Sequence, residues 1–435
     1  NARSGFDIGV GARLQIDYSG SAFLKWRGEL QRIEPAPGRF LSRQTFCTAV
    51  DFMDTMAKRK MRLEAVLFDQ RADQAIDAII SDMVDKPAAS SLAAGQDTFP
   101  QVFDATRDES TTVLREATKL VNSELGYLYP KGDTSTGGVL TFEDRHARPK
   151  FGSSSASLVD ASLAGMRPER ATQNIFNRVK IEVSPRETSA AASIIFQLQA
   201  KPLIAQSTCA IIEGRYSDPD NRGVLRVAGA SMVAAASTTD YTMNSASDGS
   251  GTDRTADFTV STSYGGNSVR YELANTGTQS SYVTKLQARG RFIAIKEPVL
   301  SDVQSACSIA DYGEATLRLN MDYQDDPLVG ADAANALLSQ WKDPQYVLEE
   351  VSFIANKSDG MMKAALQREP GDKVTITETV SGIDKDYFIN GVELVISPKA
   401  TIECKWVLVP ADATRYWILG IVGSSELDLT TIIGY

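Results

Sequence analysis

The chain has 435 residues, with 45 Lys and Arg against 55 Asp and Glu, and its formal net charge is −10. A hydrophobic fraction of 43% and a charged fraction of 23% are typical of an ordinary globular protein. No apolar run reaches the roughly 20 residues of a membrane-spanning helix, and the start at Asn1 lacks the profile of a signal peptide. The length is more than one core usually fills and predicts about three domains.

The first 51 residues and the segment after them are expected to form strands and then a helix. Residues 1–51 contain three segments that alternate between polar and apolar residues and are separated by turn residues, which predicts strands. An apolar face over residues 69–84 predicts a helix with Asp69 as its N-cap.

A second helix is predicted over residues 110–125, with Ser110 as N-cap and Gly126 just beyond its end. The segments YLYP and VLTFED then predict two strands. The small and polar residues of 152–178 predict a loop.

Residues 179–300 differ in character, because Ser, Thr, Ala and Gly dominate and strand-like runs are short. Such closely spaced runs predict a β-sandwich, whose most loop-like part is residues 232–255. After Ala310 the sequence predicts a strand at LRLNMDY and a helix over 331–341.

From Glu369 onward the chain is a ladder of alternating strands that continues to Tyr435, as in ATIECKWVLVP. Hydrophobic side chains in this ladder need to be covered, either by another part of the chain or by another subunit. Residues 311–435 carry ten Lys and Arg against twenty Asp and Glu, a difference of −10, so the rest of the chain is neutral. An acidic third disfavours wrapping of nucleic acid; it suits either a surface that DNA passes without sticking or a solvated exterior.

These patterns together predict a mainly β chain with a few helices (α+β). We expect four parts, at residues 1–85, 86–178, 179–300 and 301–435. Both ends are rich in strands, so residues 1–85 and 311–435 are expected to pack together, with the sandwich as an excursion between them.

The sequence offers little catalytic chemistry. The single histidine, His146, has no GxSxG elbow or comparable signature to accompany it, and an interface imidazole is the simpler interpretation. The stretch DGSGTD at 248–253 lacks the ligand spacing of an EF-hand and favours a hairpin turn over a calcium site, as does DPDN at 218–221. A pair of acidic residues acting together, as in glycosidases, needs no fixed spacing and stays open.

The tryptophans and cysteines also have simple structural interpretations. Tryptophans can serve as sugar platforms, but most of those in this chain lie in strand or helix patterns that favour core packing. The cysteines are about 100 residues or more apart and form no CxxC pair, which favours free buried thiols in a reducing cytoplasm over a zinc site. We therefore assign no catalytic, cofactor-binding or metal-binding residues. The residues concerned are Trp26, Trp341, Trp406, Trp417, Cys47, Cys209, Cys307 and Cys404.

Several segments resemble, in chain order, the minor tail or tail-hub proteins of long-tailed bacteriophages, which are related to the central baseplate protein of contractile tails. The resemblance covers nearly the whole chain, and its return segment is the nearest match. The segments are ARLQIDYSG with FLKWRGELQRIEPAPGRF, the strand-into-short-helix step TFCTAVDFMDTMAKRKM, GGVLTFEDRHARPK, NIFNRVKIEVSPR, SYVTKLQARG, Tyr312-Gly313 with QWKDPQ, GDKVTIT, DYFINGVELVI and WVLVPA, and the closing WILG with SSELDLTT.

The resemblance implies two hub-type β-barrel-like domains, a small α/β part and an inserted β-sandwich, with the start of the first barrel upstream of Asn1. It implies a non-enzymatic virion protein at the tail tip, assembled in the host cytoplasm without a cofactor. Three subunits would form a pseudo-sixfold ring around the DNA channel. Implied partners are the tail tube or distal tail protein, tip or fibre proteins, the tape measure protein, and DNA in transit.

Two other functions stay open at this point. The first is a fibre-anchoring or receptor-contacting tip protein whose sandwich touches host glycans. The second is a tail-borne hydrolase that opens the cell wall. The sequence does not distinguish a contractile from a non-contractile tail, and it does not name the host.

Overall fold

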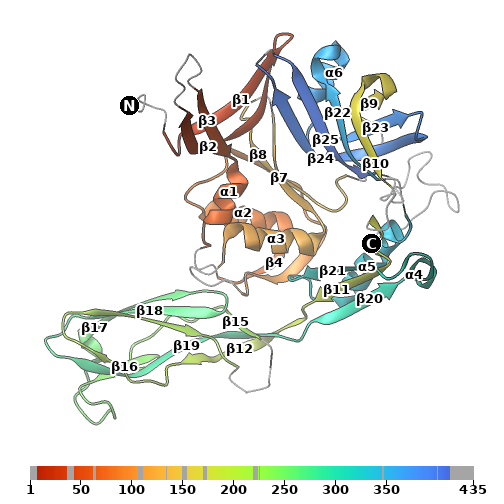
Figure 1. The fold of residues 1–435 in the computed structure, drawn as a ribbon. Coiled ribbons are helices and arrows are strands. Elements are labelled where there is room, and N and C mark those ends of the chain that lie inside the picture. Colours follow the sequence, from red (N-terminus) through yellow and green to blue (C-terminus); the bar gives the residue numbers. More distant parts are fainter. Residues whose placement is uncertain are drawn as a thin grey trace.

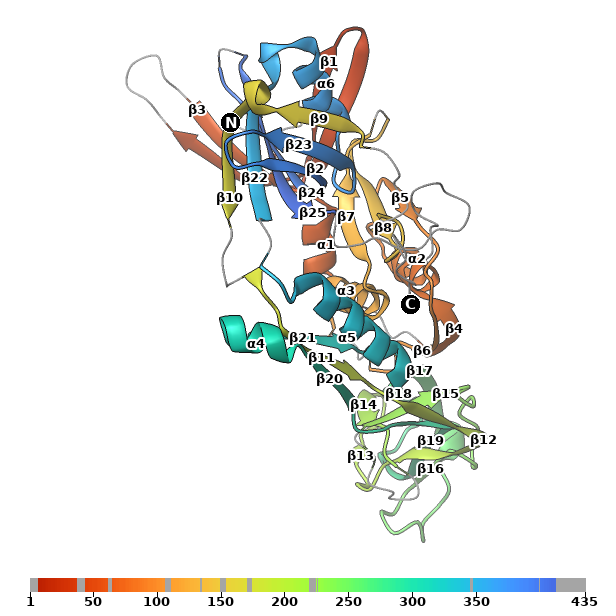
Figure 2. The ribbon, with the colours of Figure 1, turned by 90° about the vertical axis from the view of Figure 1, so that its right-hand side faces the viewer.

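The structure, a computed structural model, describes residues 7–36, 44–61, 65–105, 111–133, 135–148, 154–169, 174–218, 224, 226–344, 347–398 and 400–411. The chain is mainly β, as predicted. Figure 1 and Figure 2 show an elongated arrangement, with the N-terminal strands and a C-terminal sheet at one end, an inserted β-domain at the other, and helices between them. The strands predicted after Ala411 lie outside the described residues.

The N-terminal strands form a three-stranded antiparallel sheet. These strands are β1 (Gly11–Tyr18), β2 (Ser21–Ala36) and β3 (Gln44–Val50). The long β2 pairs with β1 along residues 21–29 and with β3 along residues 29–36. Gly28 lies where the two pairings meet, and a Cβ there would collide with the Val50 carbonyl oxygen and the Trp26 ring, so no larger residue fits.

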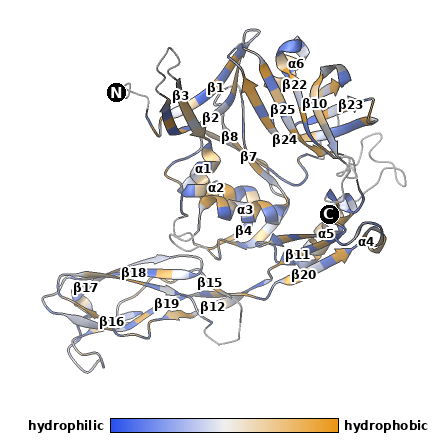
Figure 3. Ribbon diagram, viewed as in Figure 1, coloured by the Kyte–Doolittle hydropathy of each residue, from blue (hydrophilic) through white to orange (hydrophobic). Residues whose placement is uncertain are grey.

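Helices and short strands follow around a second core. They are α1 (Phe52–Lys58), β4 (Leu67–Arg71), α2 (Ala72–Asp82), β5 (Ala89–Leu92), β6 (Thr98–Val102), α3 (Val113–Glu124), β7 (Tyr127–Lys131) and β8 (Val139–Glu143). Both α2 and α3 carry hydrophobic and hydrophilic residues (Figure 3), and each buries its apolar side. Phe99, Phe103 and Phe142 are fully buried between them and the strands, together with Tyr323 from much later in the chain.

Both predicted helices exist, but α2 begins later than the sequence indicated. Asp69, the predicted N-cap, lies inside β4 with a φ of 52°, and Arg71 is the N-cap residue. At this end of α2 the Gln74 side chain accepts from Arg71 N at 3.0 Å, and the pairing of β4 with β6 fixes the strand that leads into the helix. At α3 the N-cap is Thr112, whereas the predicted Ser110 lies outside the described residues.

The end of α3 also differs from the prediction. The prediction that Gly126 is the left-handed residue after α3 is wrong, because Leu125 adopts that conformation, with a φ of 57°. Gly126 N donates to Val121 O at 3.0 Å. Gly126 is needed for a different reason, because a Cβ at this position would collide with the Glu143 carbonyl oxygen of β8.

The C-terminal half forms a six-stranded sheet in the order β10-β22-β25-β24-β23-β9. Its strands are β9 (Ala156–Val159), β10 (Leu163–Glu169), β22 (Val347–Ile354), β23 (Lys373–Glu378), β24 (Ile383–Ile396) and β25 (Ile402–Pro410). The helix α6 (Asp359–Gln367), which the sequence analysis missed, packs into the same core. That core contains Trp406, whose ring meets the ring of Phe353 edge-on at 4.8 Å.

The loop predicted over 152–178 is wrong where β9 and β10 lie. These strands form the two opposite edges of the six-stranded sheet, yet one turn of 3₁₀ helix, Asp160–Ser162, separates them along the chain. The sheet must therefore curl until its two edges approach each other. Leu158 is buried in the core of the curled sheet and Met166 packs against it, and this tertiary packing selects strands in a segment whose composition favours a loop.

The N-terminal strands pack against this C-terminal sheet, as the strand-rich character of both ends led us to expect. Ile16, Tyr18 and Phe23 lie against its core, and the Tyr18 hydroxyl donates to Asp359 of α6 at 2.9 Å. Residues more than 300 positions apart thus share one hydrophobic cluster.

A third sheet lies near the base of the inserted domain, in the order β20-β11-β21, with a helix packed on it. Its elements are β11 (Arg178–Val183), β20 (Val299–Gln304), α4 (Ala306–Tyr312), β21 (Thr316–Met321) and α5 (Pro327–Trp341). The helix predicted over 331–341 is α5, which begins earlier because the Asp326 side chain caps it by accepting from Leu328 N at 2.8 Å.

The inserted domain consists of two antiparallel sheets that share one hydrophobic core, and Figure 1 shows it projecting from the rest of the chain. Its strands are β12 (Arg186–Gln197), β13 (Leu203–Ile204), β14 (Cys209–Arg215), β15 (Arg226–Ala230), β16 (Tyr241–Asn244), β17 (Phe258–Tyr264), β18 (Ser268–Asn275) and β19 (Ser281–Ile295). Tyr271 and Leu273 are fully buried in its core. Arg186 pairs with Ile295, so the chain enters and leaves the sandwich at one place.

Candidate functional site

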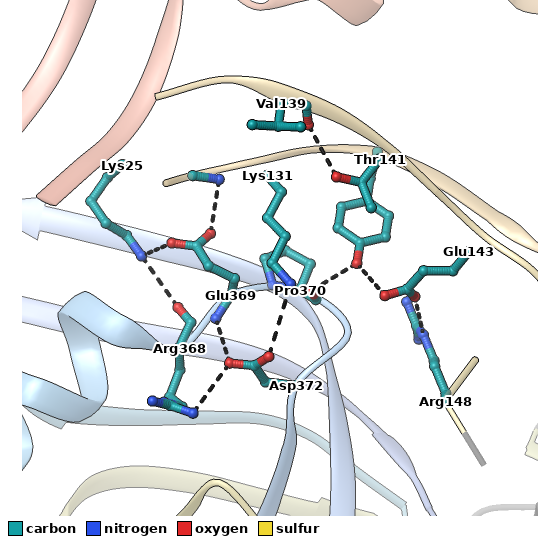
Figure 4. A network of polar contacts seen from close by, with 12 residues as sticks. Lys25, Lys131, Val139, Thr141, Glu143, Arg148, Arg368, Glu369, Pro370 and Asp372 are labelled. Carbon is teal, nitrogen blue, oxygen red and sulfur yellow. Dashed lines mark hydrogen bonds and ion pairs between the residues drawn. The ribbon is translucent and has the colours of Figure 1, made fainter. Parts of the chain in front are cut away.

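The first candidate site is the joint between the N-terminal strands, β7 and the C-terminal sheet (Figure 4). Lys25 of β2 forms an ion pair with Glu369, and it also donates to the carbonyl oxygens of Leu366 and Arg368 at 3.2 Å each. The side chains of Lys25 and Glu369 are 5% and 12% exposed. An ion pair so far from water holds its two elements in one register, because each charge depends on the other.

The same turn is tied to β7. Gly132 N donates to Glu369 Oε2 at 3.2 Å, and Glu369 N donates to Asp372 Oδ2 at 3.2 Å. Arg368 Nη1 lies 3.5 Å from Asp372 Oδ2, and Lys131 Nζ lies 4.0 Å from Asp372 Oδ1. The turn between α6 and β23 is thereby fixed by contacts to two other parts of the chain.

A second group of contacts in Figure 4 centres on Glu143. Tyr129 Oη lies 2.7 Å from Glu143 Oε1 and 2.8 Å from Pro370 O, and Arg148 Nε donates to Glu143 Oε2 at 3.1 Å. Burial and the nearby Glu143 raise the pKa of Tyr129 far above its ordinary value, so the hydroxyl stays protonated and acts as a donor. Arg148 also donates to Asn390 Oδ1 at 2.5 Å, and its guanidinium lies 3.5 Å from the centre of the Tyr127 ring.

Between these elements lies a groove of about 310 Å³. Its walls combine apolar side chains of β1, β2 and β24 with charged side chains of the joint. The lining residues include Leu14, Lys25, Trp26, Lys131, Glu369, Val392 and Leu394. The mixture is that of a packed domain joint, with no convergent set of nucleophile and base.

The second candidate site is the base of the inserted domain. Arg186 Nε donates to Asp104 Oδ2 at 2.8 Å, and both side chains are 1% exposed. Arg186 Nη1 also donates to Ser184 O at 2.8 Å, and Gln101 Nε2 donates to Thr188 Oγ1 at 3.0 Å. A pocket of about 580 Å³ opens beside this pair, lined by both signs of charge, including Asp104, Arg115, Lys119, Glu182, Arg186, Arg215 and Asp322.

A third polar cluster connects α3 to the segment after β21. Glu124 is fully buried and accepts from Gln96 N at 2.9 Å and Asp97 N at 3.3 Å. Burial raises the pKa of Glu124 to about 7. Asp97 in turn receives two hydrogen bonds from Arg145, at 2.7 and 2.9 Å, and one from Gln324 at 3.0 Å.

The residues that the sequence analysis considered for chemistry are dispersed. His146 is half-buried in the turn after β8. In the same turn, Arg145 forms an ion pair with Asp97 and Arg148 forms one with Glu143. Within the described ranges, no group of three or more His, Cys, Asp or Glu side chains is placed to hold a metal ion. Among those same residues, no helix is long and apolar enough to cross a membrane.

The stretch 248–253 forms the predicted turn. Asp248 accepts from Ser250 N at 2.9 Å, and Asn244 bridges to Asp253 across the loop. Gly249 has a φ of 83°, which a glycine adopts readily. Asp218 is described, but residues 219–221 lie outside the described ranges.

The cysteines differ from the expectation. Cys404 is buried and its pKa is raised to about 12 by burial, but Cys47, Cys209 and Cys307 are exposed. Cys47 and Cys209 lie on outward-facing positions of strands β3 and β14, and sequence spacing alone did not reveal which face these positions occupy. Trp406 is a core residue and Trp26 lines the joint groove, while Trp417 lies outside the described residues.

The residues of the joint and of the insert base were missed by sequence reasoning. Lys25 lies within an alternating strand pattern and Glu369 lies in a turn, so neither carries a local signal of a long-range ion pair. Arg186 follows a Ser-Pro step between two strands, which marked a boundary but not a buried charge.

Comparison with known proteins gives likenesses at the level of structure. No protein-family model matches the chain, and no curated protein matches it. It is similar to the tail protein of Neisseria meningitidis MC58, with 10% identity over 92% of this chain and 85% of that one and a TM-score of 0.48. It is also similar to the 43 kDa tail protein of prophage MuSo2 from Shewanella oneidensis, with 10% identity over 95% and 84% and a TM-score of 0.49.

A third likeness is to prophage tail protein gp18 of Listeria monocytogenes EGD-e, with 9% identity over 92% of this chain and 84% of that one and a TM-score of 0.39. All three neighbours are phage tail proteins. At these identities and TM-scores, the likenesses transfer no function to this chain.

Proposed function

We propose that this chain is a structural virion protein of a phage tail tip, a tail hub that closes the end of the tail tube and surrounds the DNA channel. The observation that carries the proposal is the shared core of the N-terminal strands and the curled C-terminal sheet, with a separate inserted domain that projects away from them (Figure 1). The order of the tail-hub-like segments in the sequence supports the same proposal.

The contacts described above suit a protein that keeps a fixed shape within an assembled particle. The buried ion pair Lys25–Glu369 fixes the joint, and the buried ion pair Arg186–Asp104 fixes the insert base. Separating either pair would leave a buried charge without its partner. Under this proposal three copies form a ring, joined to the tail tube or distal tail protein above and to tip or fibre proteins below. The tape measure protein and the DNA would pass through its centre.

The test is the position and copy number of the chain in an assembled particle. Symmetry-free reconstruction of the tail tip, with quantitative mass spectrometry of purified particles, should find three copies at the tip. Six or more copies stacked along the tail would identify a tube protein instead. A chain absent from particles would contradict the proposal altogether.

A second candidate function rests on the projection of the inserted domain. The sandwich lies at the far end of the molecule from the joint (Figure 2), where it is placed to meet a receptor or a fibre. Its outer sheet exposes Thr259, Ser261 and Ser263 on β17, next to β18. Changing these three residues to Glu should abolish adsorption of the particle under this alternative, and it should leave adsorption unchanged if the chain is a hub alone.

A further inference from the structure

Two grooves meet at Arg27 of β2. The first is the joint groove of about 310 Å³, and the second, of about 180 Å³, reaches α1 at Phe52. Both are lined by Arg27, Asp51, Pro130 and Gly138, so they form one continuous groove between β2 and the strands β7 and β8. A Cβ on Gly138 would lie 3.2 Å from the Arg27 Cβ, so the stem of Arg27 lies over the residue that leads into β8. We call this continuous surface the Arg27 groove.

Unpaired basic side chains gather at this groove, although the net charge of the chain is −10. Arg27 and Lys86 line it, both are exposed, and neither forms a side-chain hydrogen bond or ion pair with another described residue. Arg13 of β1 lies directly opposite Arg27 in the sheet, is also exposed and has no described side-chain partner either. Like charges directly opposite each other destabilise a pair of strands. The face of the sheet at Arg13 and Arg27 therefore carries positive charge that the chain does not neutralise.

The acidic side chains of the groove do not offset this charge. Glu369 is already paired with Lys25. Asp51 caps α1, where its side chain accepts from Met53 N at 2.9 Å. Among the described lining residues, Glu29 is the remaining carboxylate, and it is exposed and without an ion pair. The three unpaired basic side chains therefore outnumber the one unpaired carboxylate.

Apolar side chains flank the charged centre of the groove. Leu14, Trp26 and Val392 line one end, and Phe52 and Leu140 line the other. Polar groups set among apolar walls are typical of sites that hold a ligand with both kinds of group. A protein segment offers both, whereas the phosphate backbone of a nucleic acid would leave the apolar walls uncovered. The net charge of −10 also repels a long polyanion more strongly than a short acidic segment.

We propose that the Arg27 groove binds an extended, acidic segment of a partner protein. A Glu or Asp of that segment accepts hydrogen bonds from the Arg27 guanidinium, whose planar fork matches a carboxylate, and Arg13 and Lys86 add attraction nearby. Apolar side chains of the same segment lie against Leu14 and Trp26. The bound carboxylate relieves the repulsion between the two opposed arginines. The inference does not depend on the proposed function, because the groove and its charges are properties of the chain alone.

Fluorescence anisotropy with the purified chain tests the groove. The probe is a short labelled peptide in which Glu and Leu alternate, and the matched probe has Gln in place of each Glu. The dissociation constant of the Gln probe should be about tenfold higher or more. Arg27→Glu should raise the dissociation constant of the acidic probe by a similar factor. Arg318→Glu makes the same charge change at an exposed arginine of β21 that has no described side-chain partner, and it should leave the dissociation constant unchanged.

Arg27→Gln separates loss of the contact from loss of the fold. Removing one of two opposed arginines should keep or raise the melting temperature while it weakens binding of the acidic probe. No binding of the acidic probe at up to about 1 mM, equal binding of the Gln probe, or unchanged binding by Arg27→Glu would overturn the proposal. An oligonucleotide that binds more tightly than the acidic probe and loses affinity in Arg27→Glu would overturn it in favour of a nucleic-acid site. None of these results alters the copy number at the tail tip, so the proposed function is tested separately.

Discussion

The buried Arg186–Asp104 ion pair shows how strongly a single buried contact can affect the stability of the fold. Asp104→Ala leaves the Arg186 guanidinium buried without its carboxylate, and we expect the free energy of unfolding to fall by about 3–5 kcal/mol. Replacing both residues by apolar ones, Asp104→Leu with Arg186→Met, should recover most of the loss. Urea unfolding of the wild type, of Asp104→Ala and of the double variant measures the three free energies of unfolding.

A matched control for that prediction lies nearby on the surface. Lys296 and Glu187 form an ion pair at 3.0 Å, but their side chains are 55% and 61% exposed. Water and salt screen such a pair, so Glu187→Ala should change stability little. Equal losses for Asp104→Ala and Glu187→Ala would contradict the assigned role of burial.

Glu124 makes the folding stability of the chain depend on pH. Burial raises its pKa from the ordinary 4.5 to about 7. A carboxyl group whose folded-state pKa is raised contributes its full stability below pH 4.5 and loses it as the pH rises through about 7. Each unit of pKa shift corresponds to about 1.4 kcal/mol.

We therefore expect Glu124→Gln to flatten the pH dependence of stability. From about pH 5 to about pH 8, the unfolding free energy of the wild type should fall relative to the variant by roughly 1–3 kcal/mol. Denaturant unfolding at several pH values measures this difference. Parallel profiles for the two proteins would show that Glu124 is ionised throughout.

At the scale of elements, the start of α3 separates local sequence signals from tertiary ones. Thr112 accepts a hydrogen bond from Arg115 N at 3.3 Å, whereas sequence reasoning chose Ser110. Thr112→Ala should lower the free energy of unfolding by about 1 kcal/mol, and Ser110→Ala should have a smaller effect. Calorimetric melting of both variants measures the difference, and a larger effect at Ser110 would restore the sequence-based assignment.

The two edges of the C-terminal sheet illustrate the same separation on a larger element. β24 and β25 were predicted from their alternation, because each buries one face in a core that the strand itself largely specifies. β9 and β10 carry no such signal, and their conformation follows from pairing with β23 and β22, whose paired residues lie 178 to 218 positions later.

At the scale of the whole molecule, the N-terminal strands complete the C-terminal core. Ile16→Asp places a charge against the cluster around Trp406 and should increase amide hydrogen exchange in β24 and β25, which lie more than 360 residues later. Ile33→Asp, a matched change in the part of β2 that pairs with β3, should leave that exchange unaltered. Equal protection of β24 and β25 in the wild type and Ile16→Asp would show that the C-terminal sheet is stable without the N-terminal strands.

The sequence by itself determined the mainly β character, the helices α2, α3 and α5 and the terminal ladder as far as β25, because the periodic spacing of apolar residues marks the buried face of each element. It also gave the turn at 248–253. The tertiary structure alone decided that β9 and β10 close the six-stranded sheet, that three cysteines face outward, and that Lys25 meets Glu369 and Arg186 meets Asp104. Those outcomes depend on partners far away along the chain, and no local pattern of hydrophobicity or capping encodes the position of a distant partner.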